Sequence, residues 1–247
     1  MTALRIERDG ALLRIAMTRP ERRNAFDASL IAELTDAFKD VGDARAVLLS
    51  GDGPSFSAGA DVEWMRSSVD LTHDENVADA LRLRAMLDAI DSCLAPVVAR
   101  VQGHALGGGC GLVACSDIAI ASPDAQFAFS EVKLGIVPAV ISPFALAKIG
   151  SSAARRYFVT GERFGADIAL RIGLVHEIAD DLDAAVDHVV GELLSAGPNA
   201  ARAAKELARA PLSPEETAQR IAAHRTSDEG QDGLRAFLEK RSPSWRD

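Results

Sequence analysis

One stretch of the sequence organises the rest of the chain, Val97-Val98-Ala99-Arg100-Val101-Gln102-Gly103-His104-Ala105-Leu106-Gly107-Gly108-Gly109-Cys110-Gly111. The β-branched run after Pro96 is typical of a buried strand, and the apolar, alanine-rich residues after Gly111 are typical of a helix. A strand, a glycine turn and a helix in this order leave backbone N–H groups free at a helix N-terminus. Such groups stabilise a bound anion or an oxyanion that develops during a reaction. A plain tight turn would use the same glycines, so this stretch alone leaves both interpretations open.

The composition is that of a well-packed protein with one large domain. The chain has 247 residues, of which 48% are hydrophobic, and a formal net charge of -9. This charge disfavours a general nucleic-acid or membrane surface, so we expect no partner of either kind. Three cysteines without a C-x-x-C pair, no apolar run of about 20 residues and no signal-like N-terminus predict a cytoplasmic protein.

Strand and helix patterns alternate through the first 180 residues. Asp9-Gly10 between two apolar runs indicates a β-hairpin, and Asp27 is a good N-cap for the helix that follows it. From residue 181 onward the apolar spacing is helical throughout, with helices expected over residues 181–194, 198–209, 214–224 and 228–241. The sequence therefore predicts an α/β core that contains the site at residues 1–180 and a helical region at residues 181–247.

A second stretch of small residues, Ser57-Ala58-Gly59-Ala60-Asp61, follows another predicted strand. In open α/β folds the loops at the ends of the strands face the ligand. This loop and the glycine stretch each have backbone N–H groups that can point at one position. Two converging N–H groups would stabilise negative charge on a carbonyl oxygen, so the two loops together are a candidate oxyanion hole.

Glu131 is the best candidate for acid/base chemistry. Apolar residues occupy positions 132, 134, 136 and 137, and an apolar environment disfavours the charged carboxylate and moves its pKa toward neutrality. A carboxylate at a helix N-terminus, or a surface ion pair with Lys133, fits the same spacing. The sequence alone leaves these alternatives open.

Other groups carry weaker patterns. His104 lies in the glycine stretch, where we expect a histidine held by backbone groups rather than a base. Ser57 and Ser130 lack the G-x-S-x-G context of a hydrolase nucleophile, and the remaining histidines lack zinc-ligand spacing, so no metal is expected. Gly109-Cys110-Gly111-Leu112-Val113-Ala114 matches the dinucleotide fingerprint G-x-G-x-x-A, but it does not follow its strand directly.

These features together resemble the enoyl-CoA hydratase/isomerase (crotonase) family almost from end to end. The earlier motifs that carry the resemblance are Arg19-Pro20-Glu21-Arg22-Arg23-Asn24-Ala25, Phe56-Ser57-Ala58-Gly59-Ala60-Asp61, Val101-Gln102-Gly103-His104-Ala105-Leu106-Gly107-Gly108-Gly109, and Ala125-Gln126-Phe127 through Glu131 and Leu134-Gly135. The later ones are Thr160-Gly161-Glu162-Arg163-Phe164, Ala169-Leu170-Arg171-Ile172-Gly173-Leu174-Val175 and Phe237-Leu238-Glu239-Lys240-Arg241. Several motifs in the same order over this length are a specific signal.

The resemblance implies an α/β fold, a spiral of ββα units with a helical C-terminal region for trimerisation, and a homotrimer or homohexamer. It implies an acyl-CoA thioester as substrate and no cofactor, because coenzyme A is part of the substrate. Ala60 N–H and Gly108 N–H match the family's oxyanion-hole donors, and Glu131 matches its acid/base. Positions that match substrate-binding residues are Ala58, Asp61, Gly107, Phe237 and Lys240, the last two toward a CoA bound by a neighbouring subunit.

Gly111 departs from the family pattern. Two-carboxylate hydratases carry a glutamate at this position, whereas family isomerases that shift a double bond use only the glutamate at position 131. Pro138-Ala139-Val140-Ile141-Ser142-Pro143-Phe144, together with Ala154-Arg155-Arg156-Tyr157-Phe158, resembles hydratases of the methylglutaconyl-CoA type, which can lack the first glutamate. We therefore expect hydration of a 2-enoyl-CoA, with an isomerase, other crotonase chemistry such as thioester hydrolysis and a catalytically silent acyl-CoA-binding scaffold as alternatives. Residues 67–75 and 138–144 are expected to shape the acyl pocket.

Overall fold

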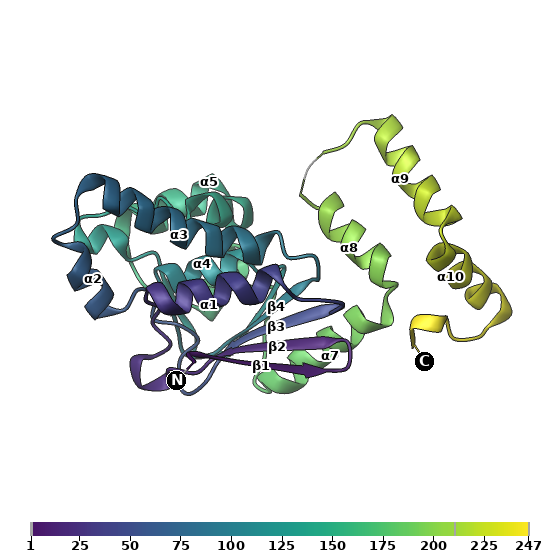
Figure 1. The fold of residues 1–247 in the computed structure, drawn as a ribbon, viewed down its shortest axis with the longest axis horizontal. Helices are drawn as coiled ribbons and strands as arrows, with labels where there is room; N and C mark the ends of the chain where they lie inside the picture. Colours follow the sequence, from purple (N-terminus) through teal and green to yellow (C-terminus); the bar gives the residue numbers. More distant parts are fainter. Residues whose placement is uncertain (1, 210, 247) are drawn as a thin grey trace.

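The computed structural model describes residues 2–209 and 211–246, and its core is built on a six-stranded sheet (Figure 1). The strands are ordered β1-β2-β3-β4-β6-β9, and every neighbouring pair is parallel except the β1–β2 hairpin. The hairpin predicted at Asp9-Gly10 is confirmed. The bounds are β1 (Leu4–Asp9), β2 (Leu12–Met17), β3 (Ala46–Gly51), β4 (Val97–Val101), β6 (Ile118–Ala121) and β9 (Glu177–Ile178).

A second, three-stranded sheet lies beside the first and has the order β5-β7-β8. Its strands are β5 (His104–Leu106), β7 (Gln126–Ala128) and β8 (Phe164–Gly165). The chain twice forms a strand of the first sheet, then a strand of the second sheet, then a helix, as β4-β5-α4 and β6-β7-α5. This is the expected spiral of ββα units. The strand β5 was not predicted, because its three residues lie inside the glycine stretch that we interpreted as a turn.

Helices cover both faces of the six-stranded sheet, so its strands are buried on both sides, as parallel strands usually are. On one face lie α1 (Ala28–Lys39), α3 (His73–Asp91), α4 (Gly108–Cys115) and α5 (Ser142–Thr160) (Figure 1). On the other face α7 (Leu182–Ser195) packs its Val186 and Val190 against Leu48 and Val98. The remaining core elements are η1 (Pro20–Arg22), α2 (Val62–Ser68), η2 (Glu131–Leu134) and α6 (Ala166–Arg171).

Local signals place several helix ends. The Asp27 side chain accepts a 3.0 Å hydrogen bond from Leu30 N–H and begins α1, as predicted. Thr72 and Glu75 form a capping box that begins α3, so the polar segment 67–75 is the tight junction of two helices rather than a loose loop. Gly150 has φ of 67° and kinks α5, which therefore consists of two helices that meet at this glycine.

The last part of the chain is helical, as predicted. It contains α8 (Pro198–Leu207), α9 (Pro214–Thr226), α10 (Asp228–Glu239) and η3 (Ser244–Arg246), and α8 to α10 project from the core (Figure 1). The helix α7 packs on the six-stranded sheet although it follows the predicted boundary at residue 180, and that boundary stays a prediction. The outer limits of the two predicted parts, residues 1 and 247, lie outside the described residues.

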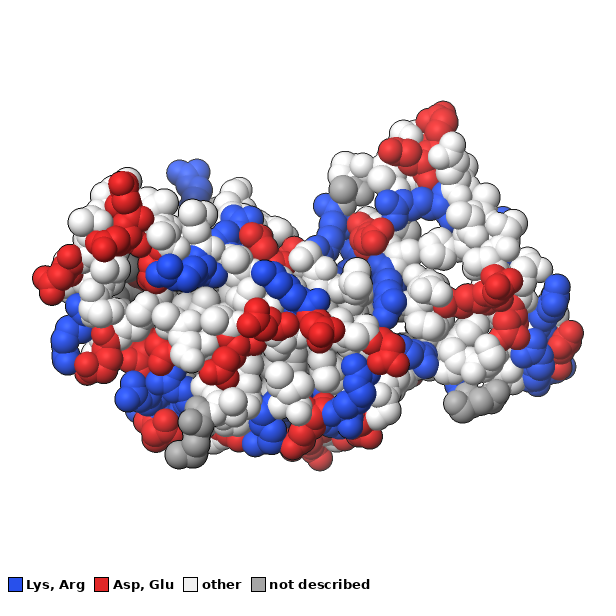
Figure 2. Space-filling view, in the orientation of Figure 1, with Lys and Arg blue, Asp and Glu red and all other residues white. Residues whose placement is uncertain are grey.

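The surface carries both signs of charge. Figure 2 shows Lys and Arg side chains interspersed with Asp and Glu over the visible face. Within residues 2–209 and 211–246, no helix has both the length and the apolar character needed to cross a bilayer.

Candidate active site

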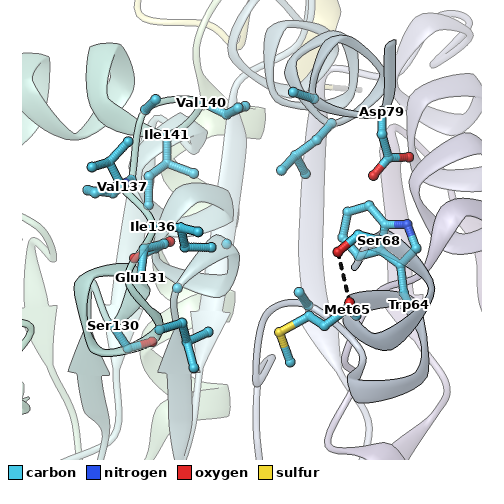
Figure 3. A pocket seen from close by; sticks show the side chains of 18 of the residues that line it. Trp64, Met65, Ser68, Asp79, Ser130, Glu131, Ile136, Val137, Val140 and Ile141 are labelled. Carbon is cyan, nitrogen blue, oxygen red and sulfur yellow. Dashed lines mark hydrogen bonds between the residues drawn. The ribbon is translucent and has the colours of Figure 1, made fainter. Parts of the chain in front are cut away.

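A cavity of about 310 Å³ lies between two walls of the core (Figure 3). One wall is formed by residues 130–141 and is mainly apolar, with Ile136, Val137 and Val140 facing the cavity. The other wall comes from α2 and α3 and includes Trp64, Met65, Ser68 and Asp79. The two small-residue loops form the part of the lining that connects the walls, with Ala58, Ala60, Gly107 and Gly108. Both segments expected to shape the acyl pocket therefore contribute to it.

The two loops lie against each other. Ser57 N–H donates to His104 O at 2.9 Å, and Leu106 N–H donates to Ser57 O at 3.0 Å, which makes a short parallel bridge. Gly59 has φ of +83°, and a Cβ at this residue would lie 2.4 Å from Leu106 O. Only glycine allows so close an approach of the two backbones, so the small residues bring both loops to one place.

The candidate oxyanion donors have no partner within the described chain. Phe26 bonds the groups on either side of Ala60, because its N–H donates to Gly59 O and its carbonyl accepts from Asp61 N–H. Successive groups of an extended backbone alternate in direction, so Ala60 N–H points away from Phe26. Gly108 is the first residue of α4, where an N–H has no acceptor one turn earlier. Neither N–H donates to another group of residues 2–209 and 211–246.

Buried polar side chains hold the Ala60 loop in position. The Asn24 amide donates to Asp52 O at 2.9 Å and to Ser55 O at 2.8 Å, and the Ser57 hydroxyl donates to Asn24 O. These bonds connect η1 to the loop that carries Ala60. The sequence motif around Asn24 therefore has a structural role next to the site.

Asp61 forms ion pairs beside this loop. Its carboxylate accepts from Arg22 Nη1 at 2.9 Å and from Glu63 N–H at 2.8 Å, and it caps α2. Burial by itself would raise the pKa of Asp61, but the hydrogen bonds from Arg22 and from Glu63 N–H hold it below the ordinary value. The side chain does not line the cavity, so contact with substrate stays a prediction for Asp61.

Glu131 is the first residue of η2, and its carboxyl group faces the glycine turn. A Cβ on Gly107 would lie 3.4 Å from Glu131 Oε1, so the carboxyl group is next to the start of α4. Its Oε2 is buried and has no hydrogen-bond partner in the described chain. Burial raises the pKa of Glu131 above its ordinary 4.5, opposed only by a hydrogen bond with its own backbone. No ion pair of Glu131 with Lys133 forms among the described residues, and Lys133 does not contribute to the shift of the Glu131 pKa.

The position of Gly111 is closed by packing. A Cβ here would lie 2.7 Å from Ile141 Cγ2 and 3.5 Å from Leu87 Cδ2. The Ile141 side chain is 2% exposed, so it has little room to move away. A glutamate at position 111 therefore has no space beside this isoleucine.

Other predicted residues lie away from the cavity of their own chain. Phe237 is exposed on α10 and Lys240 follows that helix, so their contact with the CoA of a neighbouring subunit stays a prediction. His104 Nδ1 lies 3.3 Å from the Ser55 hydroxyl and does not line the cavity. Gly109 and Gly111 lie inside α4 rather than in a loop before it, which contradicts a dinucleotide fingerprint.

Asp79 is a cavity residue that sequence reasoning missed. Its side chain is 14% exposed, and among the described lining residues only Asp79 and Glu131 are ionisable. In the sequence Asp79 is one of several charged residues on a polar helix, and no local pattern separates it from its solvated neighbours.

Comparison with known proteins identifies the family and the fold of this chain. A model of the enoyl-CoA hydratase/isomerase family matches residues 7–247. The crotonyl-CoA hydratase of Syntrophomonas wolfei is 32% identical, over 97% of this chain and 96% of that protein. The crystal structure of an enoyl-CoA hydratase from Shewanella pealeana is 42% identical, with a TM-score of 0.93 over 98% of this chain and 96% of that one. Pseudomonas aeruginosa AtuE is 35% identical, with a TM-score of 0.93 over 99% of this chain and 100% of that one. These structural similarities confirm the predicted fold class.

Proposed function

Because the chain belongs to the enoyl-CoA hydratase/isomerase family, we propose that it is a lyase that adds water across the 2,3 double bond of a 2-enoyl-CoA. The observation that carries this proposal is the placement of Glu131. Its buried carboxyl group, with one oxygen unpaired in the described chain, stands beside Gly107 at the start of α4. Acid/base and oxyanion groups therefore line one cavity of a size suited to an acyl group.

The two backbone N–H groups would act on the thioester carbonyl. When the oxygen accepts hydrogen bonds from Ala60 and Gly108, the carbonyl is polarised and the enolate that forms at it is stabilised. The start of α4 adds the positive end of its helix dipole to this stabilisation. Because both donors are backbone groups with no other partner in the described chain, they need no rearrangement before reaction.

Glu131 would supply the proton of the reaction. Its raised pKa favours the protonated carboxyl group, which can give its proton to the α-carbon of the enolate. The apolar wall around it lowers the local dielectric, which strengthens the interaction of this group with the enolate. No metal or cofactor is needed for this step, in line with the proposal that coenzyme A enters as part of the substrate.

Isomerisation of a 3-enoyl-CoA to a 2-enoyl-CoA is the second candidate function. It is favoured by Gly111, because Ile141 fills the place of a second glutamate and a single carboxylate suffices to move one proton. Glu131 would then remove a proton from the α-carbon and return it to the γ-carbon. The oxyanion donors would serve the same enolate.

The proposal extends to the shape of the acyl group and to the oligomeric state. Val140 and Ile141, from the segment that resembles methylglutaconyl-type hydratases, line the cavity and support a branched acyl chain. Phe237 and Leu238 are 82% and 77% exposed on α10, and apolar side chains in such a cluster favour burial against another subunit. We therefore propose a homotrimer or homohexamer in which Phe237 and Lys240 approach the CoA of a neighbour.

Absorbance at the enoyl-thioester band tests the function, with crotonyl-CoA and a 3-enoyl-CoA as separate substrates. Loss of the band from crotonyl-CoA marks hydration, and a gain from the 3-enoyl-CoA marks isomerisation. We expect Glu131→Gln to abolish hydration and keep CoA affinity, whereas Glu206→Gln, a surface change on α8, leaves the rate unchanged. Hydration by Glu131→Gln at the wild-type rate would refute the role of Glu131, and no reaction with measurable CoA binding would favour a scaffold.

A further inference from the structure

Asp79 is a second carboxylate in the cavity that the mechanism above does not use. It lies on α3, and Figure 3 shows it on the wall opposite Glu131. Its side chain is 14% exposed, although α3 carries many freely solvated charges. Desolvation of a carboxylate in an otherwise largely apolar pocket costs free energy, and a hydrogen bond from a polar group bound in the pocket would offset this cost.

The contacts of Asp79 leave one oxygen available to that occupant. Arg82 Nη2 donates to Asp79 Oδ1 at 2.8 Å, which holds the carboxylate in place from the next turn of the helix. Oδ2 takes no hydrogen bond from the described residues. Two neighbouring polar groups on this wall already have partners, because the Ser68 hydroxyl donates to Met65 O and the Asn76 amide donates to Leu71 O and Thr72 O.

Hydration needs two proton transfers. Water must lose a proton as its oxygen bonds to the β-carbon, and the α-carbon must gain one. Glu131 is next to the glycine turn and serves the α-carbon. The position of Gly111 has no room for a base, because Ile141 and Leu87 close it. Among the described lining residues this leaves Asp79 as the one carboxylate besides Glu131.

We infer that Asp79 is the second catalytic carboxylate, which holds the attacking water and accepts its proton across the cavity from Glu131. This inference rests on the proposed hydratase function. In the step, the water oxygen bonds to the β-carbon and one O–H bond breaks, with its proton passing to Asp79 Oδ2. The π electrons of the double bond move into the enolate held by Ala60 and Gly108 N–H. The carboxylic acid of Glu131 then protonates the α-carbon, and transfer of a proton from Asp79 to Glu131 through solvent restores both groups.

Two reactions of the same protein separate Asp79 from Glu131. One is hydration of crotonyl-CoA, which needs both carboxylates. The other is exchange of the α-protons of butyryl-CoA with D₂O, followed by NMR, which needs only Glu131 and the oxyanion donors. We expect Asp79→Asn to lower kcat for hydration by about 100-fold or more, the usual contribution of a general base, and to change the exchange rate less than about twofold. Glu131→Gln should lose both reactions.

Asp88 provides a matched control on the same helix. It is paired with Arg84 at 2.8 Å, as Asp79 is with Arg82, but it is half exposed and does not line the cavity. Asp88→Asn should leave both reactions unchanged, and Asp79→Glu should recover part of the hydration lost in Asp79→Asn. Hydration by Asp79→Asn near the wild-type rate would overturn the inference, and so would equal losses of hydration and exchange. A wild-type protein that exchanges α-protons but does not hydrate would instead refute the proposed function.

Discussion

Replacement of Gly111 by alanine should destabilise the protein through one contact. The added Cβ would lie 2.7 Å from Ile141 Cγ2, whereas non-bonded carbons normally stay about 3.5–4.0 Å apart. Overpacking of this kind costs about 1–3 kcal/mol. Against this, alanine in a helix is favoured over glycine by about 0.5–1 kcal/mol. The difference leaves a net loss of about 1 kcal/mol, which lowers Tm by about 2–4 °C for a chain of this length.

Two changes at Ile141 isolate the clash. Ile141→Leu removes the Cγ2 branch and keeps the side-chain volume, whereas Ile141→Val keeps Cγ2 and loses only the terminal methyl group. Gly111→Ala should therefore be neutral or stabilising when Leu is at position 141 and destabilising when Val is there. Thermal unfolding at one protein concentration gives both comparisons as a double-mutant cycle, with an expected coupling of about 1–2 kcal/mol.

The same loss of stability from Gly111→Ala with Leu and with Val at position 141 would refute this reasoning. It would mean that the alanine methyl group is accommodated elsewhere and that Ile141 does not close the position. Gly111→Glu would then also fit, and the lack of a glutamate at position 111 would have no packing cause. With the clash confirmed, Gly111→Glu should accumulate as folded protein only beside a smaller residue at position 141.

Three further predictions concern the groups around the cavity. Burial raises the pKa of Glu131 in the folded protein above 4.5, so folding favours the protonated carboxyl group. The free energy of unfolding should therefore fall as pH rises from about 4.5 through the raised pKa. Urea unfolding of Glu131→Gln at several pH values should lack this contribution to the pH dependence. Asp61→Ala removes the cap of α2 and the partner of Arg22, so kcat for hydration should fall about tenfold or more as the Ala60 loop moves, while Asp61→Asn, which can still cap, keeps more activity. Asn24→Ala leaves the buried carbonyl of Ser55 and the partly buried carbonyl of Asp52 without this donor, so the free energy of unfolding in urea should fall by about 1–3 kcal/mol; a similar loss from exposed Asn199→Ala would contradict this cause.

Much of the fold can be predicted from the sequence because it depends on contacts between residues that are close in the sequence. The cap at Asp27, the hairpin at Asp9-Gly10, the break at Gly150 and the four C-terminal helices all follow from local backbone preferences. The strand β5 was not predicted because it depends on a contact between residues that are distant in the sequence. Its three residues form a strand only because β7 lies alongside, and β7 is more than 20 residues further along the chain.

Some features of the candidate site likewise follow from the sequence, and others depend on the tertiary structure. The sequence by itself determined that two small-residue loops follow strands and that Glu131 stands among apolar residues, because chain order and residue type are enough for both. Only the tertiary structure decided that Ile141 closes the position of Gly111, that Asp61 pairs with Arg22 rather than lining the cavity, and that Asp79 stands opposite Glu131. These contacts join residues roughly 30 or more positions apart, on different elements. Their geometry depends on how the layers pack, which no run of neighbouring residues encodes.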